Sequence, residues 1–556
     1  MKTLLKFKQI IVLVILVVFA VGACTKDFEE LNTDPNNPTN VPAINIFSYV
    51  IEDAVDDWLG QGWVNHTYMA NWSQQWCKVQ YIDEDRYQVR PENRNGFFED
   101  PYMTELMDLK VILEKTAPGG ENENNPLYAA ARIFRVWVFQ QLTDLFGDIP
   151  YSQALQGDVA GSSVFPVYDS QQSIYEDMLD ELEECNTILS SLTPPELNFG
   201  EGDLLYGGDS KAWQKFGNSL YLRLLNRCHA VYSGADAKIA EILNNPAQYP
   251  IMESNDDNCK LDYPGVLPYR NGTFETLYTR TDQAISQTMV NWLKVRNDPR
   301  LPIYAKPVAA DTIIWTNVDP VFVQNPPAEW RIVDDPKTAN VIDSVMEPAP
   351  SPSYFGQQNG AAAQPNLSFR SMLGTAIAYD PAAPLYLLTY DEVEFIKAEY
   401  YLRANNDAAA QTAYETGIDA SMERWGADYD EATYLTDPLV AWNGSIAQKQ
   451  KLICEQHWAA IFGEGVEAYA EVRRTGYPSR IFEYELEKTM YPGFGLPTRF
   501  CYPINEESYN PDNLKAAKQA QGVQEANEGM FGSRLWWQTQ DYPIPTTTDV
   551  QGPGYW

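Results

Sequence analysis

The chain has 556 residues, and its 76 acidic side chains against 40 Lys and Arg give a formal net charge of −36. A surface of this charge repels phosphate backbones, which argues against nucleic acid as a partner. The apolar content of 44% and the aromatic content of 13% exclude an intrinsically disordered chain, and the length suffices for a large core.

Residues 1–23 predict a signal peptide. Three lysines precede an unbroken apolar run over 10–23, which is shorter than the ~20 residues of a membrane-spanning helix. The run ends in Val-Gly-Ala before Cys24, which resembles a bacterial lipobox, where the cysteine is acylated and becomes the first mature residue. We therefore expect a lipid anchor on Cys24, because acyl chains hold a protein on a membrane without a spanning helix. An ordinary secretory signal with a chance cysteine is the alternative.

Residues 24–43 predict a lipidated, extended tether. The acidic stretch 25–30 is similar to the sorting signal that directs some outer-membrane lipoproteins to the cell surface. The following residues, 31–42, are polar and rich in proline, which favours an extended conformation. We therefore expect the protein at the outer membrane, lipid-anchored and facing the extracellular side.

Residues 44–249 and 385–475 show helical periodicity, and we interpret them as the scaffold. Apolar stripes at helical spacing predict helices over 127–145, 174–189, 213–228, 390–403, 407–424 and 445–463. Asp209 and Ser210 form a good N-cap pair for the third of these helices. The helix pair within 394–425 has about the length of a tetratricopeptide unit, with small residues facing large ones.

Residues 250–384 and 476–556 are loop-rich by contrast. Prolines are frequent there and periodicity is weak, apart from a short hairpin expected within 312–323. The predicted fold is therefore mainly α: a tetratricopeptide-like scaffold of helix pairs with a large loop-rich ligand-binding face and a few short strands. We expect residues 44–556 to form one domain.

Eight separate strings, taken in order, carry a family resemblance. They are CTKDFEELN with DPN at 24–36, FGDIPY at 146–151, WQKFGNSL with Arg223, NDPRLP at 297–302, EVEFIKAE at 392–399, YETGI at 414–418, Trp458 through RRTGYP at 473–478, and PTR with Tyr502 and Glu506. In this order they resemble the SusD/RagB family of surface nutrient-binding lipoproteins, in its SusD-like branch. Gly217 stands where the family pattern leads us to expect Ala.

The resemblance implies a function as well as a fold. It implies a tetratricopeptide-like scaffold with a ligand face built from loops, and capture of oligosaccharides or, in some members, peptides. It also implies docking on a SusC-like TonB-dependent outer-membrane transporter, with no catalysis and no cofactor. The sequence leaves the choice between glycan and peptide open.

Aromatic side chains in two regions are the candidate ligand residues. A glycan binder needs flat apolar faces beside amide and carboxylate groups. We expect contacts from Trp63, Trp72, Tyr81, Trp315, Trp330 and Tyr354. Trp72 and Trp76 are four residues apart and would share one helix face. The alternative for each of these residues is a place in the core.

The sequence offers little support for catalysis or for a metal site. It has no G-x-S-x-G, no C-x-x-C and no H-E-x-x-H pattern. The acidic segment 253–258 is dense in oxygen ligands, but it lacks the spacing and the glycine of an EF-hand, so we expect a solvated loop without support for calcium. Two alternatives to a binding lipoprotein stay open: a structural interaction lipoprotein without a small ligand, and a surface glycoside hydrolase.

Overall fold

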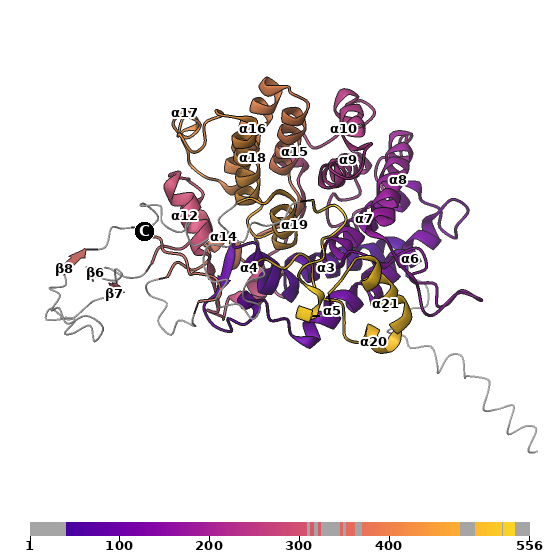
Figure 1. The fold of residues 1–556 in the computed structure, drawn as a ribbon. Helices are drawn as coiled ribbons and strands as arrows, with labels where there is room; N and C mark the ends of the chain where they lie inside the picture. Colours follow the sequence, from indigo (N-terminus) through magenta and orange to yellow (C-terminus); the bar gives the residue numbers. More distant parts are fainter. Residues whose placement is uncertain are drawn as a thin grey trace, which may run out of the picture.

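The computed structural model describes residues 41–308, 312–315, 321–323, 345–348, 352–361, 370–478, 495–524 and 526–539. The predicted signal peptide, Cys24 and Trp330 lie outside the described residues. The described part is mainly helical, as the sequence predicts (Figure 1). Within that part, no helix is long and apolar enough to cross a membrane.

Long helices form the body of the molecule. They are α3 (Ala43–Leu59), α5 (Pro91–Met103), α6 (Glu105–Thr116), α7 (Asn125–Phe146), α8 (Gln171–Ser190), α9 (Ser210–Cys228), α10 (Ala235–Asn244), α15 (Tyr390–Arg403), α16 (Asp407–Trp425), α18 (Ile446–Ala460) and α19 (Gly465–Thr475). In Figure 1, α7 to α10 and α15 to α18 stand side by side along one side, and α3 to α6 lie beneath them.

Shorter helices occupy the connections between the long ones. They are the π-helix η1 (Val64–Met69), α4 (Ala70–Trp72), α11 (Gly272–Leu277), α12 (Gln287–Val295), α13 (Leu301–Tyr304), α14 (Thr375–Ala378), α17 (Glu431–Tyr434), α20 (Glu506–Tyr509) and α21 (Pro511–Ala520), with 3-10 turns η2 (Glu84–Arg86), η3 (Asn255–Asp257) and η5 (Ala526–Gly529).

The strands are short, and the described ones pair antiparallel. The pairs are β1 (Trp76–Lys78) with β5 (Gln283–Ile285), β2 (Ile149–Pro150) with β3 (Tyr168–Asp169), and β4 (Cys259–Leu261) with β9 (Leu385–Leu388). A three-stranded sheet has the order β7 (Val321–Val323), β6 (Thr312–Trp315), β8 (Val345–Pro348). Strands β6 and β7 confirm the hairpin expected within 312–323.

Side-chain caps begin several helices where the sequence indicates. The carboxylate of Asp209 accepts hydrogen bonds from the backbone N–H groups of Lys211 and Ala212, at 2.8 and 3.3 Å, which confirms the predicted N-cap of α9. Ser445 and Gln448 form a reciprocal capping box at the start of α18. These bonds satisfy N–H groups that would otherwise lack partners within the helix.

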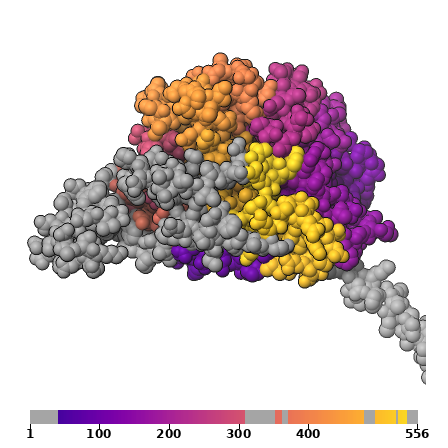
Figure 2. All heavy atoms as spheres, viewed as in Figure 1, coloured from indigo at the N-terminus to yellow at the C-terminus, as the bar shows by residue number. Residues whose placement is uncertain are grey.

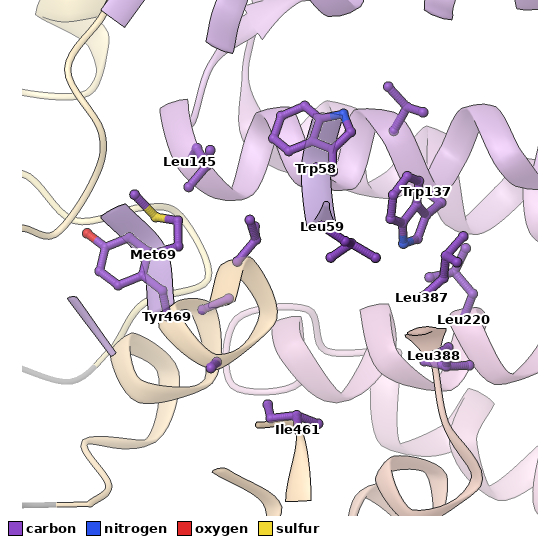
Figure 3. Packing of buried hydrophobic residues seen from close by; sticks show 14 of the residues in the cluster. Trp58, Leu59, Met69, Trp137, Leu145, Leu220, Leu387, Leu388, Ile461 and Tyr469 are labelled. Carbon is purple, nitrogen blue, oxygen red and sulfur yellow. The ribbon is translucent and has the colours of Figure 1, made fainter. Parts of the chain in front are cut away.

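One large core joins elements that lie far apart in the sequence. Trp58 of α3, Trp137 of α7, Leu220 of α9, Leu387 of β9 and Tyr469 of α19 all belong to it (Figure 3). A second cluster of buried residues lies between α15, α16 and α18. The helices before residue 250 and those after residue 385 therefore bury their apolar faces against each other.

The C-terminal segment, yellow in Figure 2, lies on the surface beside helices of the N-terminal half. Its hydrogen bonds reach the end of α7. The N–H of Phe500 donates to the carbonyl of Leu145 at 2.8 Å, and the hydroxyl of Tyr502 donates to the carbonyl of Asp148 at 2.6 Å. Between them, Gly147 has a φ of 79°, a left-handed conformation that glycine adopts without steric cost. The segment thus fixes the turn that closes α7.

Candidate functional site

A tight turn after α3 presents Trp63, one of the predicted ligand residues. The N–H of Gly62 donates to the carbonyl of Asp56 at 2.9 Å, which folds the chain back on the last turn of α3. A Cβ on Gly62 would lie 1.6 Å from the carbonyl oxygen of Asp57. Only glycine permits this approach of two backbone segments, so the turn sets the position of Trp63. The Trp63 side chain is half-buried.

A cavity of about 210 Å³ lies between this turn and α5. Three aromatic residues, Trp58, Trp63 and Phe97, line it, and Asn93 contributes an amide. The remaining lining residues are Asp57, Gly62, Val64, Glu92, Gly96, Asp100 and Pro101. Aromatic surface beside amide and carboxylate groups suits a ligand that has both C–H faces and hydroxyls.

Two arginines flank the ring of Trp63. The guanidinium carbons of Arg90 and Arg280 lie 6.0 and 5.5 Å from its ring centroid. Arg280 forms two hydrogen bonds of 2.9 Å to the Asp282 carboxylate, and Arg90 is paired with Glu84. Each guanidinium is therefore oriented by a carboxylate that balances its charge, and its remaining N–H groups are available as donors.

The structure brings Tyr81 to the same region. Strand β1 pairs with β5, with Lys78 opposite Gln283, so the loop after β1 lies beside the segment of Arg280. Tyr81 is 62% exposed and has a φ of 53°, which is uncommon for a residue with a Cβ. The pKa of Arg280 is raised above its ordinary value, chiefly by its hydrogen bonds to Asp282, and the nearby phenol of Tyr81 contributes.

An aromatic platform adjoins these residues, and the sequence reasoning missed it. The rings of Phe274 and Tyr278 on α11 stack with centroids 4.9 Å apart and planes at 10°. The guanidinium carbon of Arg270 lies 5.2 and 5.3 Å from the two ring centroids. Tyr278 is 45% exposed, and Tyr269 is 59% exposed. The signal was present in the sequence as an i, i+4 aromatic pair preceded by an arginine in a proline-bounded segment.

Helix α11 places this platform next to the turn of Trp63. The hydroxyl of Thr273 donates to the carbonyl of Leu59 at 3.4 Å, and the side chain of Asn271 caps the helix by accepting from the N–H of Phe274 at 2.8 Å. Arg280 follows the end of α11 by three residues. We call Trp63, Tyr81, Phe274, Tyr278 and their three arginines the aromatic face.

The carboxylates at the cavity wall are unusually hard to ionise. Burial and the neighbouring carboxylates of Asp53 and Asp100 raise the pKa of Asp57 to about 7. Burial also raises the pKa of Glu105 well above its usual range, with the charges of Asp57 and Asp53 adding to the effect. Asp57, in the wall, and Glu105, which lies behind it, are therefore harder to ionise than exposed carboxyl groups unless a positive charge lies beside them.

Trp72 is a correction to the sequence-based expectations. It is 1% exposed, packs edge-on against the rings of Tyr87 and Tyr469, and donates from Nε1 to the carbonyl of Glu84 at 2.9 Å. Helix α4 ends at Trp72, and Trp76 begins strand β1, so the helix face that they were expected to share does not exist. Trp76 is also 1% exposed. Both residues belong to the core.

Of the three loop residues expected to bind ligand, Trp315 and Tyr354 lie within the described part of the chain. Tyr354 is half-buried and packs against the core, and its carbonyl accepts from Lys294 Nζ at 3.3 Å. Trp315 is the last residue of β6, opposite Val345 of β8, and Trp330 lies outside the described residues. The nearby amide of Asn359 donates to the carbonyl of Trp76 at 2.8 Å. The loop that contains Asn359 therefore contacts β1, which is the strand that leads to Tyr81.

The acidic segment 253–258 forms a partly exposed turn around η3. Lys215 Nζ lies 3.0 Å from the carboxylate of Glu253 and 2.9 Å from that of Asp257. Asn258 Oδ1 accepts from the N–H of Tyr390 at 2.6 Å. Lysine and backbone groups thus occupy oxygens that a cation would need.

The comparisons with known proteins agree on one family. A family model described as "Starch-binding associating with outer membrane", of the SusD-like type, matches residues 35–314 and 331–503. A search of curated proteins found no significant match.

Several solved structures share the fold. A chitin-binding protein matches with a TM-score of 0.70 and 25% identity, covering 90% of this chain and 100% of that one. A SusD homologue from Bacteroides uniformis matches with a TM-score of 0.73 and 21% identity, with the same coverage. A putative outer membrane protein from Bacteroides vulgatus, described as probably involved in nutrient binding, matches with a TM-score of 0.69 and 23% identity over 90% and 100% of the two chains. With a family match over most of its length and the same helical architecture, this chain belongs to the SusD-like branch of the SusD/RagB family.

Proposed function

We propose that this protein binds an oligosaccharide at the cell surface without cleaving it and delivers it to a SusC-like TonB-dependent transporter. The observation that carries the proposal is the aromatic face beside the 210 Å³ cavity, where Trp63 and Tyr81 lie among oriented arginines. The family description, starch-binding and associated with the outer membrane, supports the same conclusion.

The charges of the site favour a neutral glycan over an anionic one. Arg90, Arg270 and Arg280 are paired with Glu84, Glu275 and Asp282. Since these pairs are close to neutral, they attract hydroxyl groups through donors and acceptors rather than a charged ligand. The rings cover the C–H faces of sugar units, as aromatic surfaces do in glycan sites.

Isothermal titration of the chain without residues 1–24 tests the ligand. The panel contains neutral oligosaccharides derived from starch and chitin, and peptides of similar length. We expect heat from an oligosaccharide, and we expect Trp63→Ala to raise Kd about tenfold, which corresponds to ~1.4 kcal/mol of lost stacking. The matched control is Trp442→Ala, since Trp442 is also partly buried but contacts Tyr414 and Lys449, between α16 and α18.

Three outcomes would contradict the ligand proposal. Unchanged affinity in Trp63→Ala would remove the aromatic face as the binding site. Chromatographic detection of shortened oligosaccharides after incubation would favour the glycoside hydrolase alternative. Heat from peptides, with none from any oligosaccharide, would change the ligand class to peptides and leave the site in place.

The anchor and the transporter need separate experiments. We propose that acyl chains on Cys24 hold the protein at the outer face of the outer membrane; labelled palmitate then enters the wild-type protein, and Cys24→Ala becomes soluble. Purification from native membranes should recover a TonB-dependent transporter with the wild-type protein. Recovery of the transporter together with uptake that is insensitive to Trp63→Ala would favour the structural interaction alternative.

A further inference from the structure

Two helices bring three carboxylates together beside the cavity. Asp53 and Asp57 are one turn apart on α3, and Glu105 is the first residue of α6. One oxygen of each side chain lies within 4.8 Å of the other two. We call these three side chains the α3–α6 carboxylates.

The buried member of this cluster, Glu105, lacks a hydrogen-bond partner of ordinary geometry among the described residues. Glu105 is 0% exposed, and neither of its carboxylate oxygens accepts such a hydrogen bond in the described part of the chain. The buried Oδ2 of Asp53 also accepts no hydrogen bond of ordinary geometry, and its Oδ1 accepts one of 3.4 Å from the Tyr49 hydroxyl. No described Lys or Arg forms an ion pair with the three residues.

Two other buried carboxylates, by contrast, accept hydrogen bonds from arginine side chains. Glu392 accepts two hydrogen bonds of 2.6 Å from Arg223, and Asp298 accepts from Arg300 at 2.7 Å. A buried carboxylate such as Glu105 that has no such partner is costly, and the nearby carboxylates of Asp53 and Asp57, which are partly exposed, repel it further. The α3–α6 carboxylates are therefore neutralised either by protons or by a positive charge that the described residues do not supply.

We propose that Asp53, Asp57 and Glu105 bind a divalent cation of the calcium type. Carboxylate oxygens are the ligands that hard cations prefer, and Ca²⁺ accepts them at ~2.3–2.6 Å in flexible geometry. One oxygen of each of the three side chains lies close enough to the other two for a single ion to reach all three. Mg²⁺ demands a near-ideal octahedron and keeps several waters, so a cluster of three carboxylates suits the more flexible Ca²⁺ better.

The cation would brace the wall of the cavity. Asp57 belongs both to the α3–α6 carboxylates and to the cavity lining. Asp100 of α5 lines the same cavity. The helical conformation is interrupted between α5 and α6 at Thr104, one residue before Glu105, where φ is −114° and ψ is −85°. An ion held by both helices therefore fixes α3 to this break. The site follows from the carboxylates alone and does not depend on which ligand the cavity takes.

Calcium titration of the chelator-treated chain without residues 1–24 tests the site. We expect one site by calorimetry, a higher Tm with CaCl₂, and a smaller shift with MgCl₂. Glu105→Gln, which keeps the shape of the side chain, should weaken calcium affinity at least tenfold and abolish the Tm shift. The matched control is Asp256→Asn, since Asp256 is an exposed acid of the other acidic segment and should leave both readouts unchanged.

Terbium provides a readout that reports position. Trp58 follows Asp57 directly and is buried against the same wall, so Tb³⁺ in the cluster should luminesce on tryptophan excitation and be displaced by Ca²⁺. Trp58→Phe should reduce the luminescence without altering the calcium titration. Equal calcium binding in wild type and Glu105→Gln would overturn the proposal. Absence of calcium heat, with Glu105→Gln raising Tm in chelator, would overturn it too, because the carboxylates would then be sharing protons.

Discussion

Trp63 and Trp72 show that the surroundings of a residue decide whether its side chain is accessible to a ligand or buried in the core. Both are tryptophans in the same aromatic-rich segment, and the sequence assigns both to ligand binding. Trp63 follows the Gly62 turn and lies half-exposed at a cavity, whereas Trp72 is enclosed by Tyr87, Tyr469 and Phe500. The rings that cover Trp72 come from segments up to 428 residues away, so no local pattern could identify its burial.

Gly62→Ala tests the turn that positions Trp63. The added Cβ would overlap the carbonyl of Asp57, so the turn must open and Trp63 must move. We expect oligosaccharide affinity to fall at least as far as in Trp63→Ala, with a loss of unfolding free energy of ~1–3 kcal/mol. The control is Gly157→Ala, because a Cβ there meets nothing within 4 Å. Titration and urea unfolding measure the two effects, and a neutral Gly62→Ala would contradict the role of the turn.

His66 predicts a loss of stability in acid. Burial, followed by the charge of Lys78, lowers its pKa to about 3 from an ordinary value of 6.5. Below pH 6.5 the unfolded chain binds a proton that the folded chain refuses, so the free energy of unfolding falls as pH decreases from 6.5 towards 3. His66→Asn should flatten this part of the stability profile, measured by urea unfolding at a series of pH values. A profile of unchanged slope would show that other groups control the acid transition.

At the scale of elements, helices were predictable and their interruptions were not. The periodicity predicted a helix over 390–403, and α15 has those bounds. The predicted caps were also confirmed at α9, since capping depends on a few neighbouring residues. In contrast, the π-helix η1, the end of α4 at Trp72 and the β1–β5 pair depend on contacts with distant segments. The aromatic face was missed because it is assembled by these non-local elements.

The contact between α7 and α9 explains Gly217. A Cβ on Gly217 would lie 2.8 Å from Cδ1 of Ile133 on the facing helix. Alanine is favoured over glycine inside helices by ~0.8–1.0 kcal/mol, but in this protein that gain is offset by displacing Ile133. The close approach of Ile133 gives a packing explanation for the departure from the family pattern.

A double-mutant cycle tests this explanation. We expect Gly217→Ala to be close to neutral in the wild type, and to stabilise by ~0.5–1 kcal/mol when combined with Ile133→Val, which removes the obstructing methyl group. Urea unfolding of the four proteins gives the coupling energy. An equal effect of Gly217→Ala in both backgrounds would show that the two side chains do not compete for space.

At the scale of the whole molecule, buried ion pairs connect the two helical blocks. Arg227 of α9 is 1% exposed and pairs with Asp144 of α7 at 2.5 Å and with Glu467 of α19. Arg223 of α9 pairs with Glu392 of α15 at 2.6 Å. Helices from before residue 250 and after residue 385 thus share charges in one interior, which requires the two blocks to fold together.

Arg227→Met tests this connection. The substitution keeps a long apolar side chain but leaves the carboxylates of Asp144 and Glu467 buried without their counter-charge. Removing one partner of a buried ion pair costs ~3–5 kcal/mol, so we expect a loss of that size in the free energy of unfolding. The control is Lys215→Met, which breaks the partly exposed pair with Glu253 and should cost less than ~1 kcal/mol.

Urea unfolding followed by two signals decides whether the blocks fold as one. Far-ultraviolet circular dichroism reports all helices, and tryptophan fluorescence reports the core around Trp58 and Trp137. If Arg227 joins the blocks, both signals in Arg227→Met should shift together to lower urea, while oligosaccharide affinity in the folded protein stays unchanged, because Arg227 does not line the cavity. Two separated transitions in the wild type would contradict a common interior, and an unchanged midpoint in Arg227→Met would show that its charge is not needed there.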